Sequence, residues 1–319
     1  MDKALARLGA CGIVPVVVLE DAQNALPAAD ALFSGGIDVM EITLRTKAGL
    51  ESIRAVAKNR PAMFVGAGTV LTLDQCKSCV DSGAGFIVLP GFSLPVVKWC
   101  VEHGVAVTPG CVTPTEIMTA VENGCTVLKF FPAGVYGGLS ALKALAGPFG
   151  NVTFIPTGGV DSKNIGEFAL SPFVHAVGGS WVCAKDDIKA GNFGRITDLS
   201  KEAVRNFLGF EFAHVGVNAR NEDESMKIAD LFAGLFGFEK KPGASSVFAG
   251  NSIEVMKSVY LGEKGHIAVR TNRIDAAVKR LEAGGFAVDP QTAKYRGDKT
   301  IAVYLKADFG GFAVHLLQK

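Results

Sequence analysis

Short apolar runs recur along the first 180 residues at intervals of about 20 to 25 residues, which is the length of one strand–helix unit. Amphipathic helical patterns lie between them, and several end in glycine, as helix C-caps commonly do. The eight runs cover residues 13–19, 39–44, 64–66, 86–89, 106–108, 127–131, 152–155 and 174–177. Eight such units in roughly 200 residues predict an α/β fold of the (β/α)₈ TIM-barrel type. An open doubly wound sheet is the competing architecture, and the count of eight units favours the barrel.

Polar residues fall at the carboxyl ends of these runs, where barrels of this kind build their active sites. In the second run, Glu41, Thr43 and Arg45 alternate with Ile42 and Leu44. Because strand side chains alternate between faces, the acid and the base share one face and the aliphatic pair takes the other. A structural ion pair at the barrel rim is the alternative for this segment taken alone.

The sixth run places a lysine in an otherwise apolar strand. Val127, Lys129 and Phe131 share one face, and Leu128 and Phe130 share the other. Lysines are rarely buried without a partner or a chemical role, although one near a barrel end can extend its ammonium group into solvent. A buried neutral amine can attack a ketone and form a Schiff base. We therefore predict that Lys129 is the nucleophile.

Two glycine pairs are expected just after the seventh and eighth runs. Barrels frequently hold a phosphate in these loops, where bare backbone N–H groups approach the anion. Glycine permits both the close approach and the positive φ of such sites. Either pair alone is an ordinary tight turn, but together they favour a phosphate site. The residues are Thr157, Gly158 and Gly159, and Gly178, Gly179 and Ser180.

Two short motifs suggest chemistry that the rest of the chain does not support. Gly66 and Gly68 resemble the start of a dinucleotide-binding fingerprint, but Leu71 occupies the place of its third glycine, so NAD binding is rejected. Cys76 and Cys79 form a lone C-x-x-C motif without a second pair. We assign it to a helix that begins near residues 73–74 and disfavour a zinc or redox site.

Six motifs in chain order resemble those of the bacterial 2-keto-3-deoxy-6-phosphogluconate aldolases, which also act as 4-hydroxy-2-oxoglutarate aldolases. The resemblance covers residues 5–203 and implies a class I aldolase, a carbon–carbon lyase, on a (β/α)₈ barrel. It also implies a homotrimer and no metal or organic cofactor. The motifs are Glu41-x-Thr43-x-Arg45, Gly66-Ala67-Gly68-Thr69, Leu89-Pro90-Gly91, Lys129-Phe130-Phe131-Pro132, Pro156-Thr157-Gly158-Gly159 and Gly178-Gly179-Ser180.

The resemblance assigns the Schiff base to Lys129 and the acid–base work to Glu41. The implied substrates are 2-keto acids, cleaved to pyruvate and glyceraldehyde 3-phosphate, or to pyruvate and glyoxylate. The implied substrate-binding residues are Arg45 and Thr69 for the carboxylate, Phe131 beside the lysine, Pro90 in the pocket wall, and Thr157, Gly158, Gly159, Gly178, Gly179 and Ser180 around the phosphate.

A phosphosugar isomerase or epimerase barrel is the rival interpretation, since such enzymes share phosphate loops of this kind. It would need a set of metal ligands or a second acid at the strand ends. The predicted strands offer only His175 for that purpose. We therefore favour the aldolase.

A different pattern begins near residue 209 and repeats once, which predicts a second domain of two βαβββ modules. The domains are thus residues 1–208 and 209–319. The second resembles the α+β vicinal-oxygen-chelate, or glyoxalase-like, superfamily, helped by the segments 213–217 and 235–238. Expected strands are 211–218, 245–249, 252–257, 266–270, 286–289, 300–306 and 312–317, and expected helices are 222–236 and 273–283.

In metal-binding members of that superfamily, ligands come from the first and last strands of each module. The matching residues are His214, Glu254, His266 and His315, although the family usually has glutamate at the last position. Three imidazoles and a carboxylate suit Zn²⁺, Ni²⁺ or Fe²⁺. Ordinary strand residues without a metal are the alternative. The domain is thus either a metal-dependent lyase, isomerase or dioxygenase, or a non-catalytic module for pairing or ligand sensing.

Composition narrows the remaining classes. The chain has 32 basic and 31 acidic side chains and a net charge of +1, which gives no nucleic-acid footprint. Neither a signal-peptide pattern nor an apolar run of the roughly 20 residues needed to cross a bilayer is present, so no membrane partner is expected. An odd count of 7 cysteines indicates reduced thiols and a cytoplasmic protein.

Overall fold

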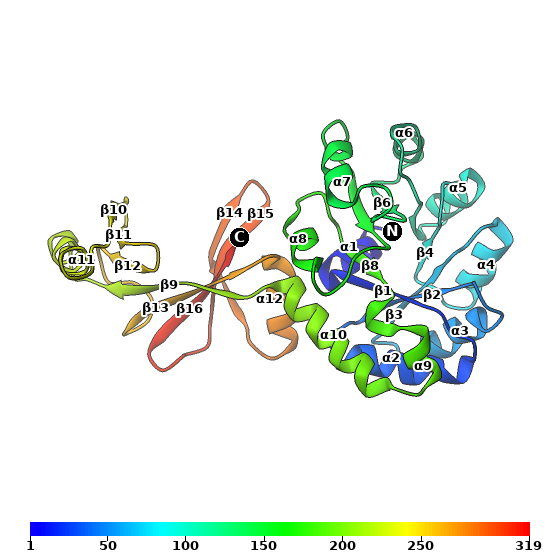
Figure 1. Ribbon diagram of the computed structural model, residues 1–319, viewed down its shortest axis with the longest axis horizontal. Helices are drawn as coiled ribbons and strands as arrows, with labels where there is room; N and C mark the ends of the chain where they lie inside the picture. The colour runs from blue at the N-terminus through cyan, green and yellow to red at the C-terminus, as the bar shows by residue number, and fades with distance from the viewer. The chain divides into compact units, whose positions relative to one another are not determined.

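The computed structural model describes residues 1–319 and divides them into two compact units, Met1–Phe207 (unit 1) and Leu208–Lys319 (unit 2). Figure 1 labels their helices and strands. Each unit has its own sheets and its own buried apolar residues. None of the helices combines the length and the apolar character that crossing a bilayer requires.

Unit 1 is built from parallel strands that alternate with helices. Six strands form a curled sheet in the order β5-β4-β3-β2-β1-β8, and β6 and β7 form a separate pair. The strands are β1 (Ile13–Val17), β2 (Val39–Thr43), β3 (Phe64–Gly68), β4 (Phe86–Val88), β5 (Ala106–Thr108), β6 (Val127–Phe130), β7 (Thr153–Pro156) and β8 (Val177–Gly179).

Short backbone contacts connect this pair to both edges of the six-stranded sheet. At the β5–β6 junction, the Lys129 N–H donates to the Pro109 carbonyl and the Cys111 N–H donates to the Lys129 carbonyl, each at 2.9 Å. At the other junction, single bridges join Phe154 to Val174 and Thr157 to Gly178. In place of the expected continuous eight-stranded barrel, unit 1 therefore has an α/β fold in which six strands and two strands meet at two narrow junctions. We call this arrangement the strand ring.

Helices follow the strands, and two of them begin with a capping box, formed by Thr72 with Gln75 and by Thr113 with Glu116. The sequence reasoning missed α1, which ends at Gly12 in the left-handed conformation. The helices are α1 (Asp2–Cys11), α2 (Ala25–Ser34), α3 (Gly49–Asn59), α4 (Leu73–Asp81), α5 (Leu94–Glu102), α6 (Pro114–Glu122), α7 (Gly138–Ala146), α8 (Ile165–Leu170), α9 (Lys185–Lys189) and α10 (Phe193–Leu208), with short 3₁₀ turns η1 (Ala22–Asn24) and η2 (Trp181–Cys183).

Alternate residues of the strands form one apolar cluster inside the strand ring. Val39 of β2 and Val127 of β6 belong to it, together with Leu8 of α1. Because side chains alternate along a strand, Glu41 and Lys129 point to the same side as Val39 and Val127. The acid and the lysine are therefore the polar continuation of this interior.

The eighth strand begins later than the sequence suggested. β8 starts at Val177, not at residue 174, so Gly178 and Gly179 lie within the strand and do not follow it. Neither has a positive φ, whereas Gly158 and Gly159 have φ of 81° and 88°. A Cβ on Gly178 would lie 2.2 Å from the Thr157 hydroxyl oxygen. Close packing therefore explains the glycine at position 178, whereas Gly158 and Gly159 are explained by their backbone conformation.

Unit 2 is an eight-stranded mixed sheet in the order β10-β11-β12-β9-β13-β16-β15-β14. The short strand β10 was not expected, and β14 begins at Val288, later than residue 286. Its elements are β9 (Glu211–Asn218), α11 (Glu222–Phe236), β10 (Lys240–Pro242), β11 (Ser246–Ala249), β12 (Ile253–Met256), β13 (Gly265–Thr271), α12 (Ile274–Ala283), β14 (Val288–Arg296), β15 (Lys299–Leu305) and β16 (Phe312–Gln318).

The two halves of unit 2 repeat one topology. The first strand of each half pairs in parallel with its last strand, β9 with β12 and β13 with β16. The intervening strands are antiparallel, and β9 and β13 join the halves as an antiparallel pair. Two βαβββ modules therefore share one sheet, with β12, β9, β13 and β16 adjacent at its centre.

Candidate active site and candidate metal centre

The strand ring of unit 1 holds a buried ion pair. The Lys129 Nζ lies 3.3 Å from Glu41 Oε1, and the two residues are 5% and 3% exposed. They come from β6 and β2, on different sheets. Burying either charge alone would be costly, so each group needs the other as a partner or is kept for a chemical role. The arrangement places a proton acceptor within hydrogen-bond distance of an amine.

The space for the Glu41 carboxylate comes from a glycine on the neighbouring strand β3. Glu41 faces Gly66 and Thr43 faces Gly68 in the register of β2 and β3. A Cβ on Gly68 would lie 2.0 Å from Glu41 Oε1, closer than any real contact. The carboxylate therefore rests over Gly68, which explains why a strand facing a charged site carries glycine there.

A second polar pair stands at the ends of the same two strands. The Arg45 Nε donates to the Thr69 hydroxyl oxygen at 3.3 Å. Thr69 is the one non-glycine residue of the chain with a positive φ, at 57°. A β-branched residue in that conformation is strained, and such strain gathers at binding and catalytic sites. The position of the Arg45 guanidinium group thus depends on a hydrogen bond to Thr69, whose backbone has an unusual conformation.

The aromatic residue expected beside the lysine is in place. The Lys129 Nζ lies 5.4 Å from the centroid of the Phe131 ring, within the range of a cation–π contact. Pro90 lies two residues after the end of β4, and its carbonyl packs so tightly against Gly110 that a Cβ on Gly110 would lie 2.2 Å from the oxygen. Both residues therefore flank the end of the strand ring that contains the ion pair.

The two glycine segments meet as the sequence suggested. The bridge between Thr157 and Gly178 brings the carboxyl ends of β7 and β8 side by side. The loop after β7 is fixed by the Gly134 N–H, which donates to the Gly158 carbonyl, and by the Asn164 amide, which donates to the Gly159 carbonyl, each at 2.8 Å. Ser180 is exposed just after β8.

Two further hydroxyl groups lie on the inner face of the strand ring. The sequence placed Thr43 on the face of Glu41 without giving it a role, and it did not single out Thr108. Thr43 and Thr108 are buried, and neither hydroxyl oxygen has a hydrogen-bond partner. Strand alternation with Val39 and with Ala106 of the central cluster is the signal that identifies them. They add acceptors and donors to the interior that holds Glu41.

His175, the one ligand available to a metal-dependent isomerase, has another role. Its Nε2 hydrogen-bonds to the Leu5 carbonyl at 2.7 Å, so it ties the segment before β8 to α1. The C-x-x-C motif is likewise internal, because Cys76 Sγ in α4 lies 3.5 Å from Cys100 Sγ in α5. Neither His175 nor the C-x-x-C motif therefore contributes a side chain to the site around Lys129 and Glu41.

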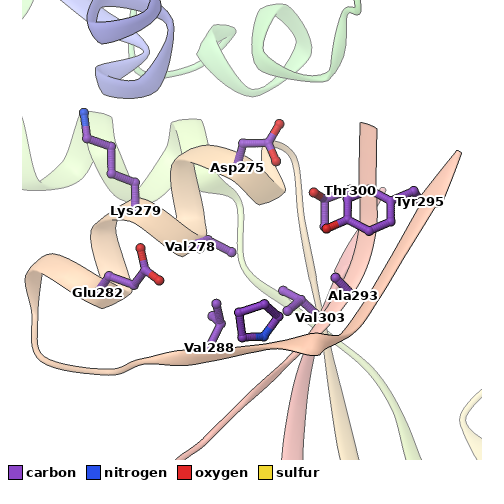
Figure 2. Close-up of a pocket in the computed structure, with 10 residues that line it drawn as sticks. Asp275, Val278, Lys279, Glu282, Val288, Ala293, Tyr295, Thr300 and Val303 are labelled. Atoms are coloured by element: carbon purple, nitrogen blue, oxygen red, sulfur yellow. The ribbon is translucent and has the colours of Figure 1, made fainter. Parts of the chain in front are cut away.

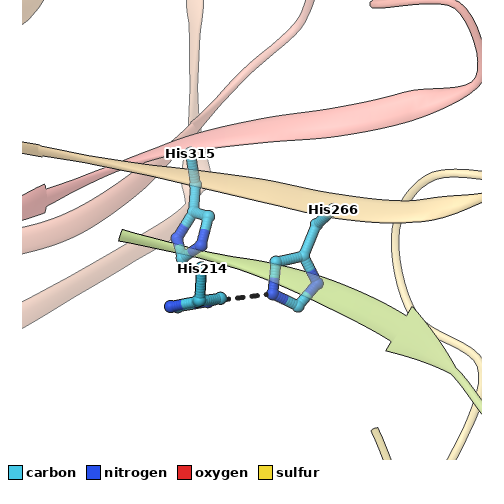
Figure 3. A group of neighbouring side chains, drawn as sticks. All are labelled: His214, His266 and His315. Carbon is cyan, nitrogen blue, oxygen red and sulfur yellow. Dashed lines mark hydrogen bonds between the residues drawn. The ribbon is translucent and has the colours of Figure 1, made fainter. Parts of the chain in front are cut away.

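Unit 2 carries a cluster of three buried histidines, His214, His266 and His315, on the adjacent strands β9, β13 and β16. One ring nitrogen from each lies within 4.8 Å of the others. The Nε2 atoms of His214 and His266 are 3.2 Å apart, as the dashed line in Figure 3 marks. We call this group the histidine cluster.

Glu254 of β12 completes it. Its Oε2 lies 3.0 Å from His214 Nε2 and 3.1 Å from His266 Nε2. Burial raises the pKa of Glu254, but hydrogen bonds from His214, His266 and Ser246 outweigh that effect and hold the pKa well below its ordinary value. Burial, with the neighbouring His266 and His214, lowers the pKa of His315 to about 3. The residues therefore present three imidazoles and one carboxylate.

This donor set fits a divalent cation. Atoms bound at about 2.1 Å with angles between square and tetrahedral lie roughly 3.0 to 3.4 Å apart. The three separations among His214 Nε2, His266 Nε2 and Glu254 Oε2 are 3.0, 3.1 and 3.2 Å. His315 Nε2 is buried without any hydrogen-bond partner. A buried ring nitrogen without a partner, on a histidine of the same cluster, adds support for a candidate ligand set.

Three further residues around the cluster were missed from sequence. A Cβ on Gly216 would lie 1.9 Å from the His266 ring, so glycine gives that ring its place. Ser246 donates its hydroxyl to Glu254 Oε1 at 2.6 Å. The Tyr304 ring stacks on His315 at 4.6 Å and 10°. Of the three, only Gly216 lay within a segment that the sequence analysis used, residues 213–217, two positions after His214.

Unit 2 also has a cavity of about 300 Å³ between α12 and the strands β14 and β15, shown in Figure 2. Val278, Val288 and Val303 are among its apolar lining residues, and Asp275 and Glu282 are exposed beside it. No histidine lines it. It therefore adds no residue to the histidine cluster.

Comparisons with known proteins concern unit 1. The family model of KDPG and KHG aldolases matches residues 5–199. The 2-dehydro-3-deoxy-phosphogluconate aldolase of Treponema pallidum is 44% identical over 193 residues, 60% of this chain and 92% of that protein.

Two solved structures share the fold. The Legionella pneumophila KDPG aldolase, with pyruvate captured as a covalent carbinolamine intermediate, aligns at a TM-score of 0.61 and 38% identity, over 63% of this chain and 97% of that one. The Zymomonas mobilis aldolase with 3-phosphoglycerate aligns at 0.58 and 38% identity, over 63% and 93%. With a family model covering more than half of its length, the chain belongs to the KDPG and KHG aldolase family and is a carbon–carbon lyase.

Proposed function

We propose that unit 1 is a class I aldolase that cleaves 2-keto-4-hydroxy acids through a Schiff base on Lys129. The substrates are 2-keto-3-deoxy-6-phosphogluconate, giving pyruvate and glyceraldehyde 3-phosphate, and 4-hydroxy-2-oxoglutarate, giving pyruvate and glyoxylate. The observation that carries the proposal is the buried contact of 3.3 Å between Lys129 Nζ and Glu41 Oε1. The strand ring acts as a (β/α)₈ barrel whose active end holds this pair.

The covalent sequence follows from the residue types. The neutral amine of Lys129 adds to the C2 ketone, and the carbinolamine loses water to give an iminium. The C4 hydroxyl gives its proton to Glu41, the C3–C4 bond breaks, and its electron pair moves into the iminium to form an enamine. The aldehyde leaves first. The enamine then takes a proton at C3, and hydrolysis of the iminium releases pyruvate and frees Lys129.

The other site residues hold the two ends of the substrate. We assign the pyruvyl carboxylate to Arg45 and Thr69, since a guanidinium group can donate to both carboxylate oxygens. Phe131 packs beside the iminium and Pro90 forms part of the wall. We assign the phosphate, or the second carboxylate of the shorter substrate, to the carboxyl ends of β7 and β8 and the residues that follow them. These residues are Thr157, Gly158, Gly159, Gly178, Gly179 and Ser180.

Reductive trapping tests this mechanism. Full-length protein is incubated with pyruvate and sodium borohydride, digested, and analysed by peptide mass spectrometry. The expected result is one pyruvate-derived adduct on Lys129, none on the Lys129→Ala variant, and loss of aldolase turnover in both cases. An adduct on another lysine, or wild-type turnover in Lys129→Ala, would overturn the assignment.

The relative preference for the two substrates is measured directly. Steady-state release of pyruvate from each 2-keto acid gives two kcat/KM values. A preference for the phosphorylated substrate supports the role of the glycine loops. Equal values would remove the phosphate site from the proposal while leaving Lys129 in place.

We also propose that unit 1 assembles as a homotrimer. Large apolar side chains stand exposed on it, including Phe33, Val135 and Tyr136, and burial of such surface drives association. Removal of unit 2 should leave this number unchanged, because we expect the trimer to form through the barrel. Light scattering on the full chain and on residues 1–208 checks it, and a monomer in both would refute it.

A second function belongs to unit 2, where we propose a vicinal-oxygen-chelate-like domain that binds one divalent metal through His214, Glu254, His266 and His315. The supporting observation is the triangle of two Nε2 atoms and Oε2 at 3.0 to 3.2 Å. A cation in this position would supply Lewis-acid polarisation of a bound oxygen. The imidazoles hold it with neutral nitrogens, and the carboxylate balances part of its charge.

Elemental analysis of the purified full chain tests the metal. We expect about one equivalent of Zn²⁺, Ni²⁺ or Fe²⁺, and loss of it in the His214→Ala variant. Protein that contains no metal and binds none on addition would leave the non-catalytic role in pairing or ligand sensing. Dialysis against a chelator should leave aldolase turnover unchanged, because Lys129 chemistry needs no cation.

A further inference from the structure

The two oxygens of Glu254 have different partners. Oε1 accepts the Ser246 hydroxyl at 2.6 Å, while Oε2 lies 3.0 and 3.1 Å from the Nε2 atoms of His214 and His266. Ser246 is 6% exposed, so water does not compete freely for its hydroxyl. The carboxylate thus has one oxygen held by the protein and one turned to the histidine cluster.

Strand register produces this division. In the antiparallel pair of β11 and β12, Phe248 lies opposite Glu254 and Ser246 lies opposite Met256. Ser246 is therefore the diagonal neighbour of Glu254 on the same face of the sheet, at a distance that a short side chain and a glutamate can bridge. The hydroxyl belongs to the strand framework and not to a loop.

A carboxylate can bind a cation through one oxygen or through both. Binding through both oxygens fills an additional coordination position. A short hydrogen bond to Oε1 opposes this mode, because it occupies one of the two lone pairs of that oxygen and fixes the orientation of the carboxylate. Turning Oε1 toward the cation would stretch this bond and weaken the only contact of a buried hydroxyl. A group that hydrogen-bonds to a metal ligand in this way fixes the orientation of that ligand, and its removal usually weakens metal binding.

We propose that Ser246 is a positioning residue that keeps Glu254 a one-oxygen ligand and so leaves a coordination position open for an incoming ligand. This inference rests on the proposed metal site of unit 2. It concerns a residue outside the four ligands, and it predicts a change in coordination number as well as in affinity.

The test uses the full chain loaded with Co²⁺, whose visible absorption weakens as its coordination number rises. Affinity is measured by competition with a chromophoric chelator. Ser246→Ala is the main variant, and Ser246→Thr restores the hydroxyl. Ser246→Cys keeps the size with a weaker donor, should the alanine variant fold poorly. Ser245→Ala, at the exposed neighbouring position, is the matched control.

We expect Ser246→Ala to weaken Co²⁺ binding by about tenfold to a hundredfold and to reduce the visible absorption of the saturated protein. Ser246→Thr and the Ser245→Ala control should behave like wild type, and Ser246→Cys should lie between. Circular dichroism confirms that each variant is folded before loading.

The outcomes separate the two proposals. Wild type that binds Co²⁺, with Ser246→Ala identical in affinity and spectrum, overturns the role of Ser246 and leaves the metal site standing. Weaker binding with an unchanged spectrum shows a structural role only and also overturns it. Wild type that binds no Co²⁺ refutes the metal site itself, and the inference about Ser246 falls with it.

Discussion

The Glu41 carboxylate faces the Lys129 amine at 3.3 Å inside the strand ring, although 88 residues separate them in the chain. A carboxylate there can both stabilise the ammonium form and accept the C4 hydroxyl proton. Replacing the carboxylate by the neutral amide of glutamine removes the base but leaves the lysine amine in place, so the proton-transfer role can be tested apart from Schiff-base formation.

Glu41→Gln should therefore lower kcat by about a hundredfold or more, the typical contribution of a general acid–base residue. Coupled pyruvate release measures the turnover. Borohydride with pyruvate should still label Lys129 in this variant, because the nucleophile remains. Turnover equal to wild type would remove Glu41 from proton transfer.

Gly68→Ala should abolish most activity without changing any residue of the ion pair. The new Cβ would occupy the place of Glu41 Oε1, which lies 2.0 Å away, and the carboxylate would have to move. Gly150→Ala is the control, since nothing lies within 4 Å of that position. Steady-state kinetics measure the activity of both variants, and a thermal melt checks that both are folded. An active, stable Gly68→Ala protein would contradict the site geometry.

Thr69→Ala should raise KM for the 2-keto acid more than it lowers kcat. The lost hydroxyl accepts from the Arg45 guanidinium, and a hydrogen bond to a charged group contributes roughly 1.5 to 3 kcal/mol, or about ten- to a hundredfold in binding. Thr69→Ser keeps the hydroxyl and should restore KM. If serine fails where alanine fails, the backbone conformation at φ 57° is the cause instead.

Gly216→Ala should remove metal from unit 2 and leave aldolase turnover intact. The methyl group would overlap the His266 ring, which lies 1.9 Å from the ideal Cβ. Gly234→Ala, in α11 with nothing within 4 Å, is the matched control. Elemental analysis and pyruvate release on the same preparations report on the two units separately. Full metal content in Gly216→Ala would show that His266 is not a ligand.

Buried thiols should resist alkylation at pH 8. Burial raises the pKa of Cys79 and Cys183 to about 12 and that of Cys125 to about 11, and only the thiolate reacts. Since pH 8 lies well below these values, the thiols stay protonated. Intact mass after iodoacetamide should show these three unlabelled in native protein and labelled in denaturant. Rapid native labelling of Cys79 would reopen the C-x-x-C motif as a reactive site.

Local patterns predicted the elements well where turn residues mark their ends. The expected strand 211–218 and helix 222–236 agree with β9 and α11. Asn221 is the N-cap of α11 and Gly237 is its C-cap. The helix α1 was missed because its mixed residues follow the start of the chain without an N-cap side chain. The glycines of β8 were misplaced because packing against Thr157, which is a tertiary effect, sets that strand.

The site shows the same division. Alternation in β2 and β6 pointed Glu41 and Lys129 inward, but their meeting depends on how two separate sheets join. Ser246 carried no signal, since a serine acquires its role only from the register that sets it diagonal to Glu254. Resemblance to aldolases supplied the residue roles that spacing alone could not.

The position of Lys129 at the β5–β6 junction has a consequence for heat inactivation. Its own N–H and carbonyl make the two backbone hydrogen bonds that join the six-stranded sheet to the strand pair there. Loosening of this junction would displace Lys129, the proposed nucleophile, directly, while most of the secondary structure stays formed. Catalysis should therefore fade at a lower temperature than helicity, making the enzyme's own turnover the earliest reporter that its scaffold is opening.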